Sequence, residues 1–142
     1  MKKGTTTSGL IAVMVATVIA FTAAVASQPI VSKNPSVDWK KAEANYVGCL
    51  ASENLGIRQS AANFVAEYQL KGAIEPLISV LKADKVESVR MSAALALVSL
   101  GDSRARAAVE DASLYDGSEK VAKFCECLLD ASAKKLSVLE QE

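Results

Sequence analysis

The stretch VRMSAALALVSLGD at residues 89–102 decides the fold class of this protein. Apolar side chains follow one another from Val89 to Leu100 with few interruptions, and Gly101 and Asp102 then break the run. A helix that is apolar on nearly every side must be covered by several neighbours. The stretch therefore predicts an interior helix of an all-helical protein, ended by a glycine turn.

The same pattern recurs along the chain at a fixed spacing. The segment IRQSAA at residues 57–62 lies 32 positions before VRMSAA at residues 89–94. One further shift of 32 positions brings Cys125 into the column that Ala61 and Ala93 occupy. A period of this length that contains two helices is typical of a helical solenoid. The small residues in this column allow the helices to approach closely.

Apolar residues at helical spacing form six stripes, separated by polar or glycine-containing breaks. No segment shows the alternation of apolar and polar residues that is typical of a strand. Pro76 falls in the first turn of the third predicted helix, where its missing N–H has no intrahelical acceptor. We therefore expect helices of about three turns over residues 39–50, 57–68, 74–81, 89–100, 105–112 and 121–129.

The repeated segments resemble a known family. VRMSAALALVSLGDSRA at residues 89–105 is similar to the second helix and turn of a HEAT-like repeat, of the short kind also found in phycobilisome lyases. GAIEPLISVL at residues 72–81 is similar to the first helix of such a repeat. The resemblance extends over residues 38–132 and implies about three antiparallel helix pairs, stacked into a short right-handed α-solenoid that usually serves as a protein-binding scaffold. It is weakest in the third repeat, where Ala122 stands in the column of Arg58 and Arg90.

Arg58 and Arg90 have two interpretations. In related repeats this arginine often pairs with an acidic residue of a neighbouring turn, and Asp102 is the obvious local candidate. The alternative is a row of arginines presented to an acidic ligand. The acidic residues of the inter-helix turns are expected to cap helices and carry solvated charge rather than act as acids or calcium ligands; these are Glu53, Asp84, Glu87, Asp116 and Glu119.

Polar residues distinguish the outer repeats from the middle one. The helix at 57–69 carries glutamines, an asparagine and a glutamate, and the helix at 121–132 carries charged residues. Short solenoids need such caps for solubility, so we expect both outer repeats to present polar ends. Trp39 and Tyr46 lie on one stripe of the first helix, where they either cover the core or form an exposed anchor for a partner.

The N-terminus has the three regions of a secretory signal peptide. Two lysines are followed by an uncharged run that ends in Ala24-Val25-Ala26, which predicts cleavage near Ala26/Ser27. An uncleaved membrane anchor is the alternative, but the run is at the short limit for spanning a bilayer. Residues 27–37 are then a linker, and residues 133–142 a tail that either extends the last helix or frays.

The residue types present argue against an enzyme. The chain has no histidine, and no phosphate-binding glycine loop occurs in it. Cys125 and Cys127 stand two apart on a predicted helix, which makes neither a redox pair nor half of a zinc site. Cys125 shares the column of buried alanines, so we expect it to be buried; a disulfide with Cys49 or an intermolecular bridge remains open in an oxidising compartment.

Charge excludes one class of partner. The 142 residues carry 16 basic and 16 acidic side chains, and removal of residues 1–26 leaves 14 basic side chains. A duplex-binding protein usually has a clear basic excess, so no nucleic-acid partner is expected.

Together these features favour an exported, secreted or periplasmic, non-enzymatic module without cofactor or metal, which binds another protein through the concave surface of the solenoid. No stable membrane anchor is expected after signal cleavage. The alternatives are a structural protein that self-associates through its solenoid ends, and a lyase-like accessory subunit.

Overall fold

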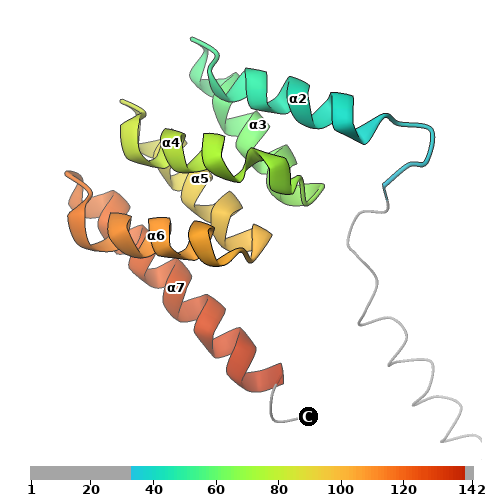
Figure 1. Ribbon diagram of the computed structural model, residues 1–142. Coiled ribbons are helices and arrows are strands. Elements are labelled where there is room, and N and C mark those ends of the chain that lie inside the picture. Colours follow the sequence, from blue (N-terminus) through green and yellow to red (C-terminus); the bar gives the residue numbers. More distant parts are fainter. Residues whose placement is uncertain (1–32, 140–142) are drawn as a thin grey trace, which may run out of the picture. The chain divides into compact units, whose positions relative to one another are not determined.

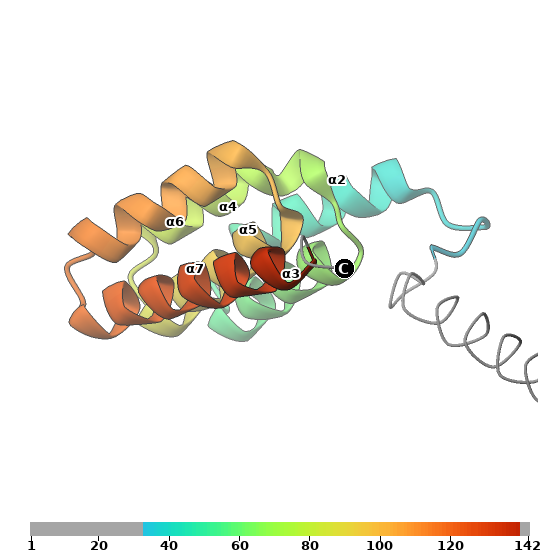
Figure 2. The ribbon, with the colours of Figure 1, turned by 90° about the horizontal axis from the view of Figure 1, so that it is seen from below.

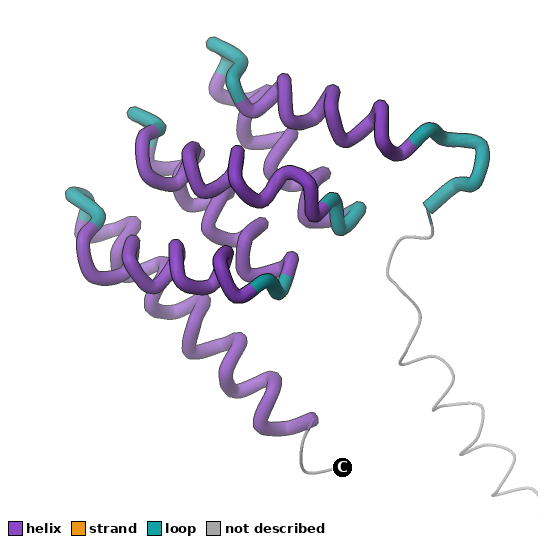
Figure 3. The backbone as a smooth tube through the Cα atoms, viewed as in Figure 1, coloured by secondary structure: helices purple, strands orange, loops and turns teal. Residues whose placement is uncertain are grey.

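The structure is a computed structural model that describes the backbone of residues 33–139 and the side chains of residues 33–134. The predicted signal peptide, residues 1–26, and most of the predicted linker lie outside the described residues. Within the described range the chain is helical throughout and contains no strand, which confirms the all-helical prediction (Figure 3).

Every predicted stripe forms a helix in the described range. The segment Lys71–Ala73 is a short 3-10 turn that leads into α4, and Pro76 lies in the first turn of that helix. The helices are α2 Trp39–Leu50, α3 Leu55–Glu67, α4 Ile74–Ala83, α5 Glu87–Leu100, α6 Ser103–Tyr115 and α7 Glu119–Leu139.

The helices form two layers. Helices α2, α4 and α6 lie side by side in one layer, and α3, α5 and α7 lie side by side in the other (Figures 1 and 2). Each helix of the first layer packs on the next helix along the chain, so α2–α3, α4–α5 and α6–α7 are antiparallel pairs. The described chain is therefore a short α-solenoid of three helix pairs. None of the described helices is long and apolar enough to cross a bilayer.

Helix α5 forms the centre of the core. Its neighbours in both layers cover it, and Ala93 and Leu97 are fully buried. Ala61 and Cys125, in the same repeat column as Ala93, are also buried. Burying one leucine side chain stabilises a fold by about 1.5–3 kcal/mol. The core thus runs through all three helix pairs, and α5 contributes the most buried residues to it.

Several helix boundaries recur at equivalent positions of the repeats. Asp38 and Asp102 are the N-cap residues of α2 and α6, where their carboxylates accept backbone N–H bonds. Gly101 ends α5 with a left-handed φ of 65°. Gln69, 32 positions earlier, also has a positive φ, 52°. A glutamine in this conformation is strained where a glycine is not, because its Cβ crowds the backbone.

Helix α7 continues past the point at which α5 ends. The position equivalent to Gly101 is Ala133, which remains helical, and the helix runs on to Leu139. A helix commonly stops where a glycine adopts the left-handed conformation. The third repeat has no such residue, so the first part of the tail extends the last helix.

The two ends of the stack differ, so the expectation that both outer repeats present polar ends is wrong. Glu126 is exposed at the end of the third repeat, in the column where Ala62 and Ala94 are fully buried. At the end of the first repeat, however, Ile57 is 45% exposed and Phe64 39%. The third repeat thus ends in a charged residue, whereas the first repeat exposes two large apolar side chains at its end.

Candidate interaction surfaces

Arg58 and Arg90 each form a bidentate ion pair with an aspartate 26 residues later. Arg58 Nε and Nη2 donate to Asp84 at 2.6 and 3.0 Å. The corresponding nitrogens of Arg90 donate to Asp116 at 2.9 and 2.8 Å. In both pairs the arginine side chain is 13% exposed and the aspartate 8%. Two parallel hydrogen bonds between charged groups fix the geometry strongly.

Asp102 is not the partner of either arginine, so that prediction is wrong. It is the N-cap of α6, and its carboxylate also lies 3.3 Å from Arg104 Nε at the surface. The aspartates that pair with the arginines end α4 and α6 instead. Those helix ends lie beside the beginning of the preceding second-layer helix, which brings residues distant in sequence together.

The remaining arginine nitrogen joins two turns of the stack. Arg58 Nη1 donates to the Ser52 carbonyl at 2.8 Å, and Arg90 Nη1 donates to the Asp84 carbonyl at 2.8 Å. Each arginine thus connects the turn of its own repeat to the turn of the next. The guanidinium groups are occupied by these bonds, so the structure favours the ion-pair interpretation over a row of arginines presented to a ligand.

These pairs shift the pKa values of their members. The hydrogen bond from Arg90 lowers the pKa of Asp116 more than burial raises it, and the backbone N–H of Ser118 lowers it further. Burial is the largest influence on Asp84 and raises its pKa, but the hydrogen bonds from Arg58 and Val86, together with the charges of Arg58 and Arg90, outweigh it. Both carboxylates therefore have pKa values below their usual range.

Asp116→Asn should reduce the dependence of stability on pH. A carboxylate whose pKa is lower in the folded than in the unfolded state stabilises the fold above the unfolded pKa, and this contribution is lost as pH falls through the folded pKa. We expect the variant to lose about 1 kcal/mol at neutral pH, because a neutral amide replaces a charged acceptor. Urea unfolding should show that the difference from wild type shrinks below about pH 4. A difference that stays constant down to pH 2–3 would contradict this account.

A second polar column was missed in the sequence. The carboxylate of Glu43 accepts the backbone N–H of Gly72 at 2.7 Å, and Glu75 accepts Arg104 Nη1 at 2.8 Å. Both contacts span 29 residues. A Cβ on Gly72 would lie 2.7 Å from the Glu43 carboxyl group, so the glycine permits this approach. The repeat period could have revealed this column, because Glu43 and Glu75 are one period apart in the sequence.

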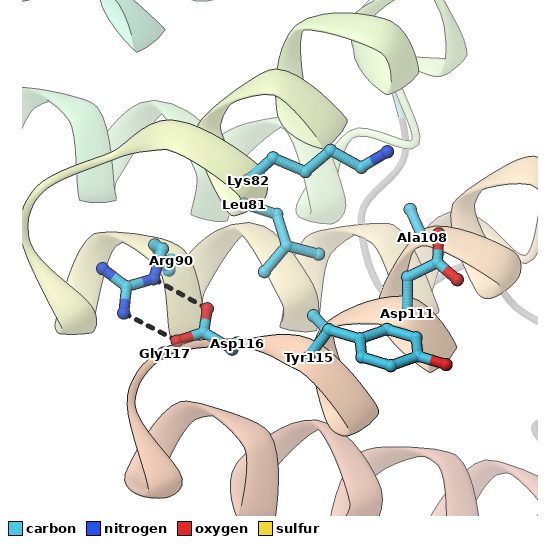
Figure 4. Close-up of a pocket in the computed structure, with 9 residues that line it drawn as sticks. Leu81, Lys82, Arg90, Ala108, Asp111, Tyr115, Asp116 and Gly117 are labelled. Carbon is cyan, nitrogen blue, oxygen red and sulfur yellow. Dashed lines mark hydrogen bonds and ion pairs between the residues drawn. The ribbon is translucent and has the colours of Figure 1, made fainter.

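A groove of about 480 Å³ separates the C-terminal ends of α4 and α6 (Figure 4). We call it the α4–α6 groove. Leu81 points into it, and the Arg90–Asp116 pair closes one end. Tyr115 stands at the opposite side and is 80% exposed. The groove is lined by Leu81, Lys82, Arg90, Ala108, Asp111, Ala112, Tyr115, Asp116 and Gly117.

Trp39 and Tyr46 help to cover the core of the first repeat. The Trp39 ring centroid lies 4.9 Å from that of Tyr68, and Tyr46 lies 5.4 Å from Phe64. Both residues are half-buried and pack against the core. The indole N–H of Trp39 also donates to the Asn34 carbonyl at 3.0 Å. These contacts favour the core interpretation over a free anchor pair.

The three cysteines are free thiols in different environments. Cys125 is fully buried, and burial, together with the charge of Asp116, raises its pKa to about 11. Such a thiol is protonated at neutral pH and is a poor nucleophile. Cys127 is exposed and Cys49 half-buried. The alternative disulfide between Cys49 and Cys125 is not formed.

Neither a metal site nor an unsatisfied polar cluster is present in the described part of the chain. No group of three or more histidine, cysteine, aspartate or glutamate side chains could hold an ion there. Every buried side-chain nitrogen and oxygen of these residues has a hydrogen-bond partner. The polar groups of the described residues are thus committed to the fold or open to solvent.

Comparison with known proteins identifies the architecture. No curated protein matches the chain. The family model for HEAT repeats matches residues 47–128, which is more than half of the sequence and spans parts of all three helix pairs. The match agrees with the column of arginines and with the two-layer stack. The chain therefore belongs to the HEAT repeat family.

Proposed function

We propose that this protein is an exported, non-enzymatic interaction module that binds another protein at the α4–α6 groove. HEAT repeats commonly mediate protein–protein interaction or scaffolding, and the family is generally not enzymatic. The observation that carries the proposal is the exposure of Tyr115, which lines the groove. Its side chain is 80% exposed, the highest value among the large apolar side chains described.

The groove has the composition of a protein interface. Its floor is apolar, formed by Leu81, Ala108 and Ala112, and charged side chains of both signs stand at its edge. Interfaces typically combine an apolar centre with a polar rim, and exposed tyrosines often dominate their binding energy. We propose that the partner inserts an apolar side chain between Lys82 and Asp111 and packs against the Tyr115 ring.

The outer surface of the second helix layer is a weaker candidate. On α5 it exposes one large apolar side chain, Leu95, which is 43% exposed. Ser88, Ser92 and Ser99 lie on the same side of the helix. A single exposed leucine is common on protein surfaces and does not mark an interface. We therefore place the partner on the α4–α6 groove rather than on the outer surface of the second helix layer.

Export is supported by the sequence of residues 1–26, with its two lysines, its uncharged run and its Ala-x-Ala end. The chain should be recovered outside the cytoplasm with a mass that begins at Ser27. Cell fractionation and intact mass spectrometry test this directly. An uncleaved chain found only in the cytosol would refute export without affecting the binding proposal.

Site-specific photo-crosslinking in the native host tests the binding proposal. A photoreactive residue at Tyr115 should give one discrete adduct, whereas the same residue at the exposed Ala44 on α2 should give none. Once the partner is identified by mass spectrometry, Tyr115→Ala should raise its dissociation constant about 30-fold, the effect of truncating a strong anchor. Equal adducts at both positions, or unchanged affinity of the alanine variant, would refute the groove as the site.

A further inference from the structure

The exposed end of the first repeat has the residue pattern of a repeat–repeat contact. Ile57 occupies the column of Val89 and Val121, which are both fully buried. Phe64 occupies the column of Ala96, which is 1% exposed. In the second repeat both columns are buried; in the third, Val121 is buried and Leu128, in the column of Phe64, is half-buried. The first repeat therefore presents, uncovered, the surface through which its successors stack.

This surface is uncharged and has both a ridge and a hollow. We call it the first-repeat end face, formed by Tyr46, Cys49, Asn54, Gly56, Ile57, Ser60, Ala61 and Phe64. Together they line a hollow of about 390 Å³, and among them the large side chains of Ile57 and Phe64 are 45% and 39% exposed and form the ridge. None of the eight residues carries a charge at neutral pH. A partner that covers the face must therefore be uncharged where it makes contact.

The opposite end of the stack does not meet this requirement. Glu126 is exposed in the column through which the first two repeats contact their successors, and the nearby Lys123 and Asp130 are exposed as well. Stacking a second copy head to tail would bury Glu126 against the apolar side chains of the end face. Burying an unpaired carboxylate in an apolar contact is strongly unfavourable.

We propose that the first-repeat end face binds the same face of a second copy, giving a two-fold symmetric dimer. A two-fold contact pairs one surface with itself, so it requires ridge and hollow on the same face. The first-repeat end face has both a ridge and a hollow. None of its residues is charged, so two copies of the face do not repel each other. The contact places α3 of one copy beside α3 of the other, and it differs from the stacking of successive repeats in that it pairs one face with itself. This contact is separate from the α4–α6 groove and does not depend on it.

The mass of the purified chain in solution tests the proposal. Light scattering across a concentration series should approach twice the mass that the denatured chain shows in mass spectrometry, and should rise no further. Ile57→Lys and Phe64→Lys each place a charge in the contact and should raise the dimer dissociation constant at least about 30-fold. Leu114→Lys, an equally drastic change at an exposed leucine of α6, should leave the dimer intact.

Each other outcome overturns the proposal. A wild-type chain that stays monomeric means that another segment, such as residues 1–32, covers the face or that it remains open. A mass that keeps rising with concentration means open-ended stacking. Dissociation by Leu114→Lys as well, with the helical circular dichroism of all variants unchanged, means that the association does not use the end face.

Discussion

Replacing Arg90 by alanine should lower the free energy of unfolding by about 3 kcal/mol, because it leaves a partly buried carboxylate without its charged hydrogen-bond donor. Asp116 would lose both hydrogen bonds from the guanidinium, and its side chain is 8% exposed. The Asp84 carbonyl would lose its bond from Nη1 at the same time. One substitution thus releases the turn of the second repeat from the turn of the third.

Arg104→Ala is the matched control for this prediction. Arg104 also pairs with a carboxylate of another helix, Glu75 at 2.8 Å, but the two side chains are 64% and 66% exposed. Exposed pairs contribute about 0–1 kcal/mol, so this variant should remain close to wild type. Chemical unfolding of both variants at neutral pH measures the difference. Equal losses would show that the Arg90 pair contributes no more than a surface pair.

The repeat period made most of the fold predictable. Residues with the same role recur every 32 positions, so the stripes, the buried column of Ala61, Ala93 and Cys125, and the glycine stop at Gly101 follow from the sequence alone. The prediction of the arginine partner is wrong because it rests on a local candidate and not on the period. Asp102 lies in the turn that follows the helix of Arg90, whereas Asp84 and Asp116 are one period apart and mark the partner column.

The candidate surfaces could not be predicted in the same way, because exposure depends on what a neighbour leaves uncovered. Ile57 has the same chemistry as Val89 and lies in the same column, yet one is exposed and the other buried. The difference is that no preceding repeat covers α3 within the described chain. Likewise the α4–α6 groove exists because small residues, Ala108 and Ala112, face Leu81 across two helices, and such a juxtaposition has no local signature.

Ala93→Leu should also destabilise the protein by about 3 kcal/mol, through overpacking rather than through loss of a contact. Ala93 is fully buried on α5, and the same column holds Ala61 and Cys125 on the flanking helices. A leucine adds three carbon atoms where the helices approach closely, so either α5 shifts or side chains leave their preferred rotamers.

Ala107→Leu separates this effect from the cost of the substitution itself. Ala107 is exposed on α6, and alanine and leucine have similar helix propensities, so the control should stay within about 0.5 kcal/mol of wild type. Thermal and urea unfolding of the two variants, followed by circular dichroism, makes the comparison. If Ala93→Leu melted with the control, the column would have room for a larger side chain. The inference that the second-layer helices approach each other closely at this column, on which the account of repeat stacking depends, would then be wrong.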